Sequence, residues 1–243
     1  MLKVVPVADI KDGLVVWAKM GLRENYKPLE SWLCPSSNLL TFISNLKKLG
    51  FKEIYLADLD AIAGKPKRFK FYREISSLIR LILDCGIEKI NEIKECLKVG
   101  VHKVVLATEV MSNLELAKEA AEKFNLEENI ALSLDLKNGL VLSRSKELSS
   151  LNPLDCLKLF SKIGFKECLI IDVARVGSFK GLDLTFLEKA KKETSLRVFA
   201  GGGVKSLMDI LSLKRIGVDG VLIASALHKN LISLSDLKKY GFI

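Results

Sequence analysis

The sequence predicts a single (β/α)8 barrel, the TIM barrel fold, built from two duplicated (β/α)4 half-barrels. Three observations lead to this fold class. Eight short apolar runs alternate with helical patterns, which is typical of parallel strands joined by helical crossovers. The chain has 243 residues, the length of one such barrel, and its two halves repeat each other. We therefore expect one domain over residues 1–243.

Each strand is expected where a Val-, Ile- and Leu-rich run is bounded by charged, small or glycine residues. The predicted strands are Lys3–Ala8, Glu53–Asp58, Leu78–Leu83, Lys103–Ala107, Asn129–Asp135, Glu167–Asp172, Leu196–Ala200 and Asp219–Ala224. Helices are expected between them, where apolar residues recur three and four positions apart. The predicted helices are Ser37–Leu49, Phe71–Ser77, Ile90–Val99, Asn113–Phe124, Pro153–Ile163, Leu184–Glu193, Leu207–Ile216, and a terminal pair near Leu227 and at Leu234–Lys239.

The repeat between the two halves also locates a long loop. ADIKDGLVV at 8–16 matches LDLKNGLVL at 134–142, and GFKE recurs at 50–53 and 164–167. Further on, Gly86 aligns with Gly203 and Gly100 with Gly217. The first pair of segments lies 126 positions apart and the GFKE pair 114, so the first half holds twelve extra residues. They fall within Lys11–Ser36, which we expect to form a lid over the carboxyl-terminal mouth of the barrel.

A glycine run after the seventh predicted strand indicates a phosphate site. Gly201, Gly202 and Gly203 leave backbone amides bare, and a helix that opens near Ser206 adds the positive end of its dipole. In barrels of this type a phosphate site commonly lies between the loops after the seventh and eighth strands. The alternative is that the glycines serve only a tight structural turn.

Two aspartates end strands that lie opposite each other in the predicted barrel. Asp9 follows the first strand and Asp135 ends the fifth, so both are expected at the same mouth. One carboxylate can remove a proton from carbon while the other, kept protonated by its surroundings, donates to oxygen. Alternatively, each aspartate only caps its own D-x-K-x-G turn.

Five segments carry a family resemblance: VADIKDGLVV, YLADLDAIAG, LSLD, AGGGVKS and GVDGVLIASAL. Together they resemble the HisA/HisF histidine-biosynthesis barrels, and more closely the HisA side, the ProFAR isomerases with their archaeal relatives. The resemblance implies an Amadori rearrangement of an aminoaldose phosphate into an aminoketose, with Asp9 as the base and Asp135 as the acid that opens the ribose ring. It also implies two phosphate grips, one in each half.

The two grips match the family pattern unequally. In the second half the phosphate-binding candidates are Gly201, Gly202, Gly203, Ala224 and Ser225, with Ala224 where glycine is usual. In the first half the glycine run has become Asp84, Cys85 and Gly86, with Glu88 in place of arginine and Ala107 in place of glycine. A carboxylate repels phosphate, so we expect a divergent paralogue with one phosphate site and an altered opposite pocket. Alternatively, a basic residue on a loop at the mouth replaces the lost phosphate contacts (Arg23, Lys65 or Arg144), or a cation beside Asp84 neutralises its charge.

Composition narrows the partners. The net charge of +9 is spread along the chain, which favours anionic small molecules over nucleic acid, since no aromatic-and-basic module is present. No apolar run reaches the length of a membrane span, and we expect a cytoplasmic protein with no membrane partner. The five scattered cysteines indicate neither a disulfide framework nor a zinc site, and we expect no cofactor and no metal.

Several residues have weaker alternative roles. Asp58, Asp60, Asp84 and Asp172 are a minor candidate for a divalent metal site, and Cys85 is expected to be a packing residue rather than a nucleophile. His102 and His228 are expected at the surface. For the whole protein, three functions remain open: the isomerase, a lyase or aldolase-like enzyme on the same barrel, and a non-catalytic paralogue. The oligomeric state is not indicated.

Overall fold

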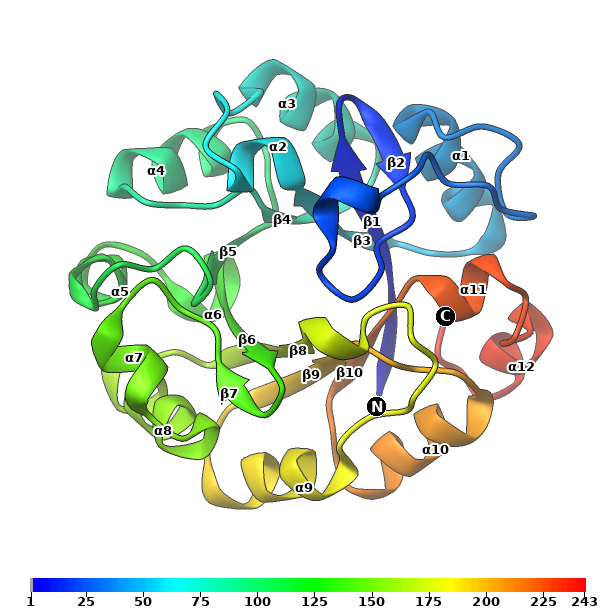
Figure 1. The fold of residues 1–243 in the computed structure, drawn as a ribbon. Coiled ribbons are helices and arrows are strands. Elements are labelled where there is room, and N and C mark those ends of the chain that lie inside the picture. Colours follow the sequence, from blue (N-terminus) through cyan, green and yellow to red (C-terminus); the bar gives the residue numbers. More distant parts are fainter. Residues whose placement is uncertain (1) are drawn as a thin grey trace.

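The computed structural model describes residues 2–243, and its strands close into the expected barrel (Figure 1). Eight parallel strands follow one another around the ring, and the last pairs with the first. In ring order they are β1 (Lys3–Lys11), β3 (Glu53–Asp58), β4 (Arg80–Asp84), β5 (Lys103–Ala107), β6 (Ile130–Lys137), β8 (Glu167–Asp172), β9 (Arg197–Gly201) and β10 (Gly220–Ile223).

Helices surround this ring in Figure 1. The longer ones are α1 (Leu39–Leu49), α3 (Phe69–Leu78), α4 (Ile90–Lys98), α5 (Glu115–Lys123), α8 (Pro153–Ile163), α9 (Leu184–Glu193) and α10 (Leu207–Arg215). Shorter segments are α2 (Leu59–Ile62), α6 (Leu126–Asn129), α7 (Lys146–Ser150), α11 (Ser225–His228), α12 (Leu234–Lys239), and the 3-10 turns η1 (Arg23–Asn25) and η2 (Val173–Arg175).

The repeated GFKE segments are helix stops. Gly50 and Gly164 end α1 and α8 in the left-handed conformation, with φ of 108° and 118°. The amide of the following phenylalanine then bonds back into the helix, from Phe51 to Leu46 and from Phe165 to Phe160. The duplication therefore preserved a helix-to-strand turn in both halves.

Three predicted strand boundaries are wrong by two or three residues. The first strand does not stop at Ala8 but continues to Lys11 and turns back as the short antiparallel strand β2 (Leu14–Val16). The fifth strand, β6, continues past Asp135 to Lys137 and pairs with β7 (Leu140–Val141) in the same way. The hairpin turns place positive φ on Asp12–Gly13 and Asn138–Gly139, as type I′ turns require. The third strand was predicted to begin at Leu78, but α3 runs through Leu78 because the Ile79 amide still bonds the Ile75 carbonyl, and β4 begins at Arg80.

Side chains fill the barrel interior in a layer separate from the larger core between strands and helices. Phe199 is a large member of the inner layer and is 6% exposed. A Cβ on Gly220, on the next strand, would lie 2.3 Å from the Phe199 ring. Glycine at that position therefore makes room for the aromatic ring that closes the interior below the mouth.

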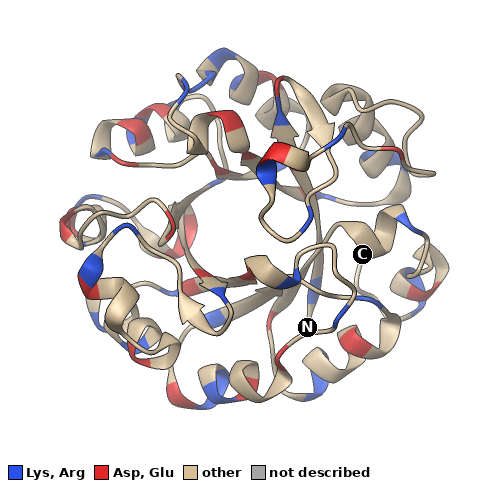
Figure 2. Cartoon of the chain, in the orientation of Figure 1, with Lys and Arg blue, Asp and Glu red and all other residues tan. Residues whose placement is uncertain are grey.

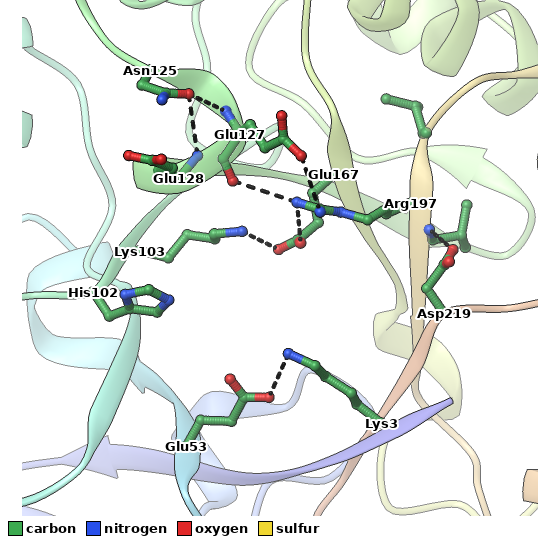
Figure 3. A network of polar contacts seen from close by, with 12 residues as sticks. Lys3, Glu53, His102, Lys103, Asn125, Glu127, Glu128, Glu167, Arg197 and Asp219 are labelled. Atoms are coloured by element: carbon green, nitrogen blue, oxygen red, sulfur yellow. Dashed lines mark hydrogen bonds and ion pairs between the residues drawn. The ribbon is translucent and has the colours of Figure 1, made fainter. Parts of the chain in front are cut away.

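Charged side chains close the opposite, amino-terminal end of the barrel (Figure 3). Lys103 Nζ lies 2.9 Å from Glu167 Oε1, and both side chains are more than nine-tenths buried. Arg197 reaches the second Glu167 oxygen at 3.3 Å. Glu167 thus carries two cationic partners in a poorly solvated place, an arrangement that is costly to break from one side.

Charges of both signs are interspersed over the outer helices in the view of Figure 2. Among residues 2–243 no helix combines the length and the apolar character that crossing a membrane requires.

Candidate active site

One pocket opens at the carboxyl-terminal mouth and brings the main predicted site residues together. Both halves of the chain line it, through strand ends, through the long loop after β1 (Lys11–Ser36, called the β1 loop below) and through the turn after β8. The lining includes Asp9, Arg23, Tyr26, Tyr55, Asp84, Glu109, Asp135, Gly201, Gly202, Gly203, Ala224 and Ser225. Every residue predicted for catalysis or for the second-half phosphate site therefore reaches one cavity, whereas of the altered first-half turn only Asp84 lines it.

Asp9 and Asp135 stand on β1 and β6, which three strands separate on either side of the ring. Burial raises the pKa of each carboxyl to about 7. Their other neighbours differ. The Arg23 cation lowers the pKa of Asp9, while the Asp84 carboxylate raises it. The Asp84 and Glu109 carboxylates raise the pKa of Asp135, while hydrogen bonds from the Ser133 hydroxyl and the Glu109 amide lower it. Arg23 thus favours the ionised form of Asp9, and the neighbouring carboxylates favour the protonated form of Asp135.

The hydrogen bonds of the two side chains do not fit the alternative in which each aspartate only caps its own turn. Asp135 Oδ1 accepts from the Ser133 hydroxyl at 2.9 Å, and Oδ2 accepts from the Glu109 amide at 3.2 Å. Among the hydrogen bonds of residues 2–243, none goes to the Asp9 carboxylate. Strand pairing and glycines at positive φ form the two hairpins. Both carboxylates line the pocket.

The second-half glycine run presents a row of free donors. The amides of Gly202, Gly203 and Val204 donate none of the hydrogen bonds found among the described residues. Gly202 and Gly203 have φ of 89° and 97°, and added Cβ atoms would lie 2.4 Å from the Asp172 carbonyl oxygen and 2.5 Å from that of Gly181. The turn thus needs glycine for its close packing, and the same backbone path leaves these three amides beside the pocket without a hydrogen-bond acceptor among the described residues.

The first-half turn is filled by its own side chain. Asp84 Oδ1 accepts from the Gly86 amide at 3.1 Å, and Oδ2 accepts from the Tyr55 hydroxyl at 3.2 Å. Burial raises the pKa of this carboxyl to about 6, while the Gly86 amide acts in the opposite direction. Cys85 is fully buried with its Sγ 3.9 Å from Cys96 Sγ, so it packs beneath the turn. A carboxylate thus takes an amide that the glycine-rich half leaves free.

Of the three basic residues considered as replacement grips, only Arg23 lines the pocket. Its guanidinium lies 2.7 Å from Glu109 Oε2. Lys65 instead binds Asp12 and Asp60, and Arg144 pairs with Glu88. Sequence reasoning missed Glu109 because it lies two residues beyond β5. The repeat contains a signal for it, since the register that pairs Gly86 with Gly203 also pairs Glu109 with Ala226.

The β1 loop lies across the mouth and contacts the second half (Figure 1). The Met20 amide bonds the Val176 carbonyl at 2.9 Å. Added Cβ atoms on Gly21 and Gly177 would meet Val173 at 2.7 Å and the Ala18 carbonyl oxygen at 2.6 Å. These two glycines allow the loop and the turn after β8 to touch, so the segment expected to be a lid covers part of the pocket in this structure.

The expectation that His228 lies at the surface is wrong. Its ring is 8% exposed, its Nδ1 lies 3.1 Å from the Ser31 hydroxyl, and it packs beside Trp17 and Phe42. Burial lowers its pKa to about 4, so it is neutral at physiological pH. The long loop covers it. His102 lies partly exposed at the amino-terminal end of the barrel.

The minor metal-site hypothesis is also not supported. No three His, Cys, Asp or Glu side chains within residues 2–243 converge on a point suited to a metal. Three of the four aspartates considered have cationic partners instead: Arg68 for Asp58, Lys65 for Asp60 and Arg175 for Asp172.

Comparison with known proteins finds relatives that match this chain over nearly its whole length. A protein of Methanocaldococcus jannaschii, described as uncharacterized, is 34% identical over 99% of this chain and 100% of its own length. The 1-(5-phosphoribosyl)-5-((5-phosphoribosylamino)methylideneamino)imidazole-4-carboxamide isomerase of Methanosphaera stadtmanae is 30% identical over 98% of both chains. The isomerase of the same name from Halothermothrix orenii is 29% identical over 98% of this chain and all of its own. A family model described as histidine biosynthesis protein matches residues 3–233, and this chain belongs to that family.

Proposed function

We propose that this protein is an isomerase that converts a phosphorylated aminoaldose into the corresponding aminoketose by an Amadori-type rearrangement. The observation that carries the proposal is the pair Asp9 and Asp135, two carboxyls with pKa values near 7 on opposite strands of one pocket, beside a row of free amides. The named isomerases among the relatives support the reaction class.

The electrostatic difference between the two carboxyls divides their roles. Burial and the neighbouring carboxylates raise the pKa of Asp135, so this residue holds a proton. It gives the proton to the ring oxygen, and the ring opens as the bond between C1 and nitrogen becomes an imine. Asp9, favoured as an anion by Arg23, removes the proton from C2. The enolamine that forms takes a proton at C1 and becomes the ketone at C2. C2 is oxidised and C1 reduced within one molecule, so the reaction needs no external oxidant or reductant.

The substrate phosphate lies, in this proposal, on the amides of Gly202, Gly203 and Val204, at the start of the turn that leads to α10. The Asp84 carboxylate in the opposite turn favours a substrate with a single phosphate over ProFAR, which carries two. A Schiff-base aldolase reaction is less well supported, because no lysine is found among the described residues that line the pocket.

The test is turnover of ProFAR and of single-phosphate aminoaldoses by the wild type and by Asp9→Asn and Asp135→Asn. Each substitution is expected to lower kcat by about 10²- to 10⁴-fold, the range of a lost general acid or base. Phosphate binding should persist in both variants. Full activity in both would exclude the mechanism. Failure of every phosphorylated sugar to raise the melting temperature would favour the non-catalytic alternative.

A further inference from the structure

The duplication lets the two ends of the pocket be compared position by position. The register that pairs Gly86 with Gly203 also pairs Asp84 with Gly201 and Glu109 with Ala226. In the second half these positions are the first glycine of the cradle and the first turn of α11, where side chains are absent or small. In the first half both carry carboxylates, and both line the pocket. The two ends have therefore acquired opposite electrostatic character.

The charges near the first-half end do not cancel. Four carboxyl groups line the pocket, Asp9, Asp84, Glu109 and Asp135, of which Asp135 carries a proton in the proposed mechanism. Arg23 is the one cationic side chain among the lining residues of the described chain. Arg23 is engaged by Glu109 at 2.7 Å. Asp84, 6% exposed, forms no ion pair within residues 2–243 and accepts hydrogen bonds there only from neutral groups, the Tyr55 hydroxyl and the Gly86 amide; the more distant Arg23 charge lowers its pKa without contacting it. A buried carboxylate without a cationic partner attracts a positive charge more strongly than one in water.

We infer that the substrate is a monophosphate whose other end carries a positively charged nitrogen, held against Asp84 while the phosphate lies on the glycine cradle. This inference rests on the proposed function and specifies its substrate class. The pocket then selects by charge at both ends: the free amides accept an anion, and the Asp84 carboxylate accepts a cation and repels a second phosphate. Tyr55 and Gly86 hold that carboxylate in place by hydrogen bonds to both of its oxygens.

Calorimetric titration with matched ligand pairs tests the inference. Each pair consists of an n-alkyl phosphate and the ω-aminoalkyl phosphate of equal chain length, over a series of lengths and with chelator present. At the length that spans the pocket, the amino ligand is expected to bind about tenfold more tightly, since desolvation offsets part of the attraction of a buried charge pair.

Variants of Asp84 test its role, and a variant of Glu88 is the matched control. Asp84→Asn keeps an oxygen for the Tyr55 hydroxyl but loses the charge, and should bind both members of a pair equally. Glu88→Gln removes a carboxylate from the same loop, one that is half exposed and paired with Arg144 outside the pocket, and should keep the preference. In the reverse direction, Asp84→Gly should raise the affinity for an alkanediol bisphosphate about tenfold.

The titrations distinguish failure of this inference from failure of the proposed function. Equal binding of amino and plain alkyl phosphates at every length, with the phosphate still bound, would overturn the inference and leave the proposed function standing. Tight bisphosphate binding by the wild type, or bisphosphate binding that appears only with Mg²⁺, would also overturn it, because Asp84 would then tolerate phosphate or hold a metal. No binding of any phosphate would contradict the cradle and the proposed function together.

Discussion

Replacing Asp9 with asparagine is expected to stabilise the protein at neutral and alkaline pH while it removes activity. Burial raises the pKa of Asp9 from 3.8 to about 7, so the folded state holds a proton that the unfolded chain releases between about pH 4 and pH 7. Stability contributed by the neutral form is present at low pH and is lost as pH rises through this window. Asparagine resembles the protonated acid in shape and never ionises.

The magnitude follows from the shift. About three pKa units at about 1.4 kcal/mol each give a cost near 4 kcal/mol above pH 7. Asp9 is partly exposed, and solvent screening reduces this to about 2 kcal/mol. For a barrel of this size, that corresponds to a melting temperature about 4–8 °C higher for Asp9→Asn at pH 8. The Asp9 side chain accepts no hydrogen bond from residues 2–243, so the substitution strands no donor among them.

The assay is chemical or thermal unfolding of the wild type and Asp9→Asn in a pH series from 5 to 9. The difference in unfolding free energy should grow up to about pH 7 and then level off. Glu88→Gln, an exposed carboxylate with an ion pair, should stay within about 0.5 kcal/mol of the wild type. A difference that does not change with pH, or an Asp9→Asn protein less stable than the wild type at pH 8, would refute the reasoning.

Three further substitutions probe the cradle, the loop and the amino-terminal end. Gly203→Ala, with its Cβ 2.5 Å from a carbonyl oxygen, should weaken binding of inorganic phosphate and destabilise by about 1–3 kcal/mol, whereas Gly217→Ala, also at positive φ but with open space, should leave phosphate binding intact in calorimetry. Gly177→Ala, which collides with the Ala18 carbonyl, should speed proteolysis within the β1 loop and raise KM, unlike Gly139→Ala. Glu167→Gln should lower the unfolding free energy by about 3 kcal/mol through the stranded Lys103 charge, with kcat unchanged; a large loss of kcat in the folded variant would contradict its structural role.

The eight barrel strands and the longer helices were predictable because each has its own local signal, whereas the short helices α2, α6 and α7 were not predicted. The GFKE repeat fixed where α1 and α8 end, since a glycine in left-handed conformation followed by a buried phenylalanine is a local stop. The start of β4 was less accessible, because Leu78 and Ile79 continue an apolar run that serves first a helix and then a strand. The hairpins after β1 and β6 were not predicted, although Asp12-Gly13 and Asn138-Gly139 are the dipeptides that such turns favour.

The composition of the pocket was predictable where side chains lie near the carboxyl-terminal ends of strands, as for Asp9 and Asp135. It was not predictable where the chain folds back on itself. That Asp84 turns into its own loop to meet Gly86 depends on backbone direction at one residue. That His228 is buried depends on a loop about two hundred positions away in sequence, which no local pattern near His228 contains.

Because the pocket is divided between the two halves, activity depends on the closure of the barrel. The segment before α6 supplies the proposed base and the anionic end, and the segment from α6 onward supplies the proposed acid and the phosphate cradle. The halves meet at two seams, β5 with β6 and β10 with β1, and at contacts that include Met20 with Val176, Lys103 with Glu167 and Ser31 with His228. Parting of either seam is expected to abolish the proposed chemistry while each half still keeps its internal strand pairs. Turnover is therefore a more sensitive reporter of barrel closure than any measure of helix or strand content.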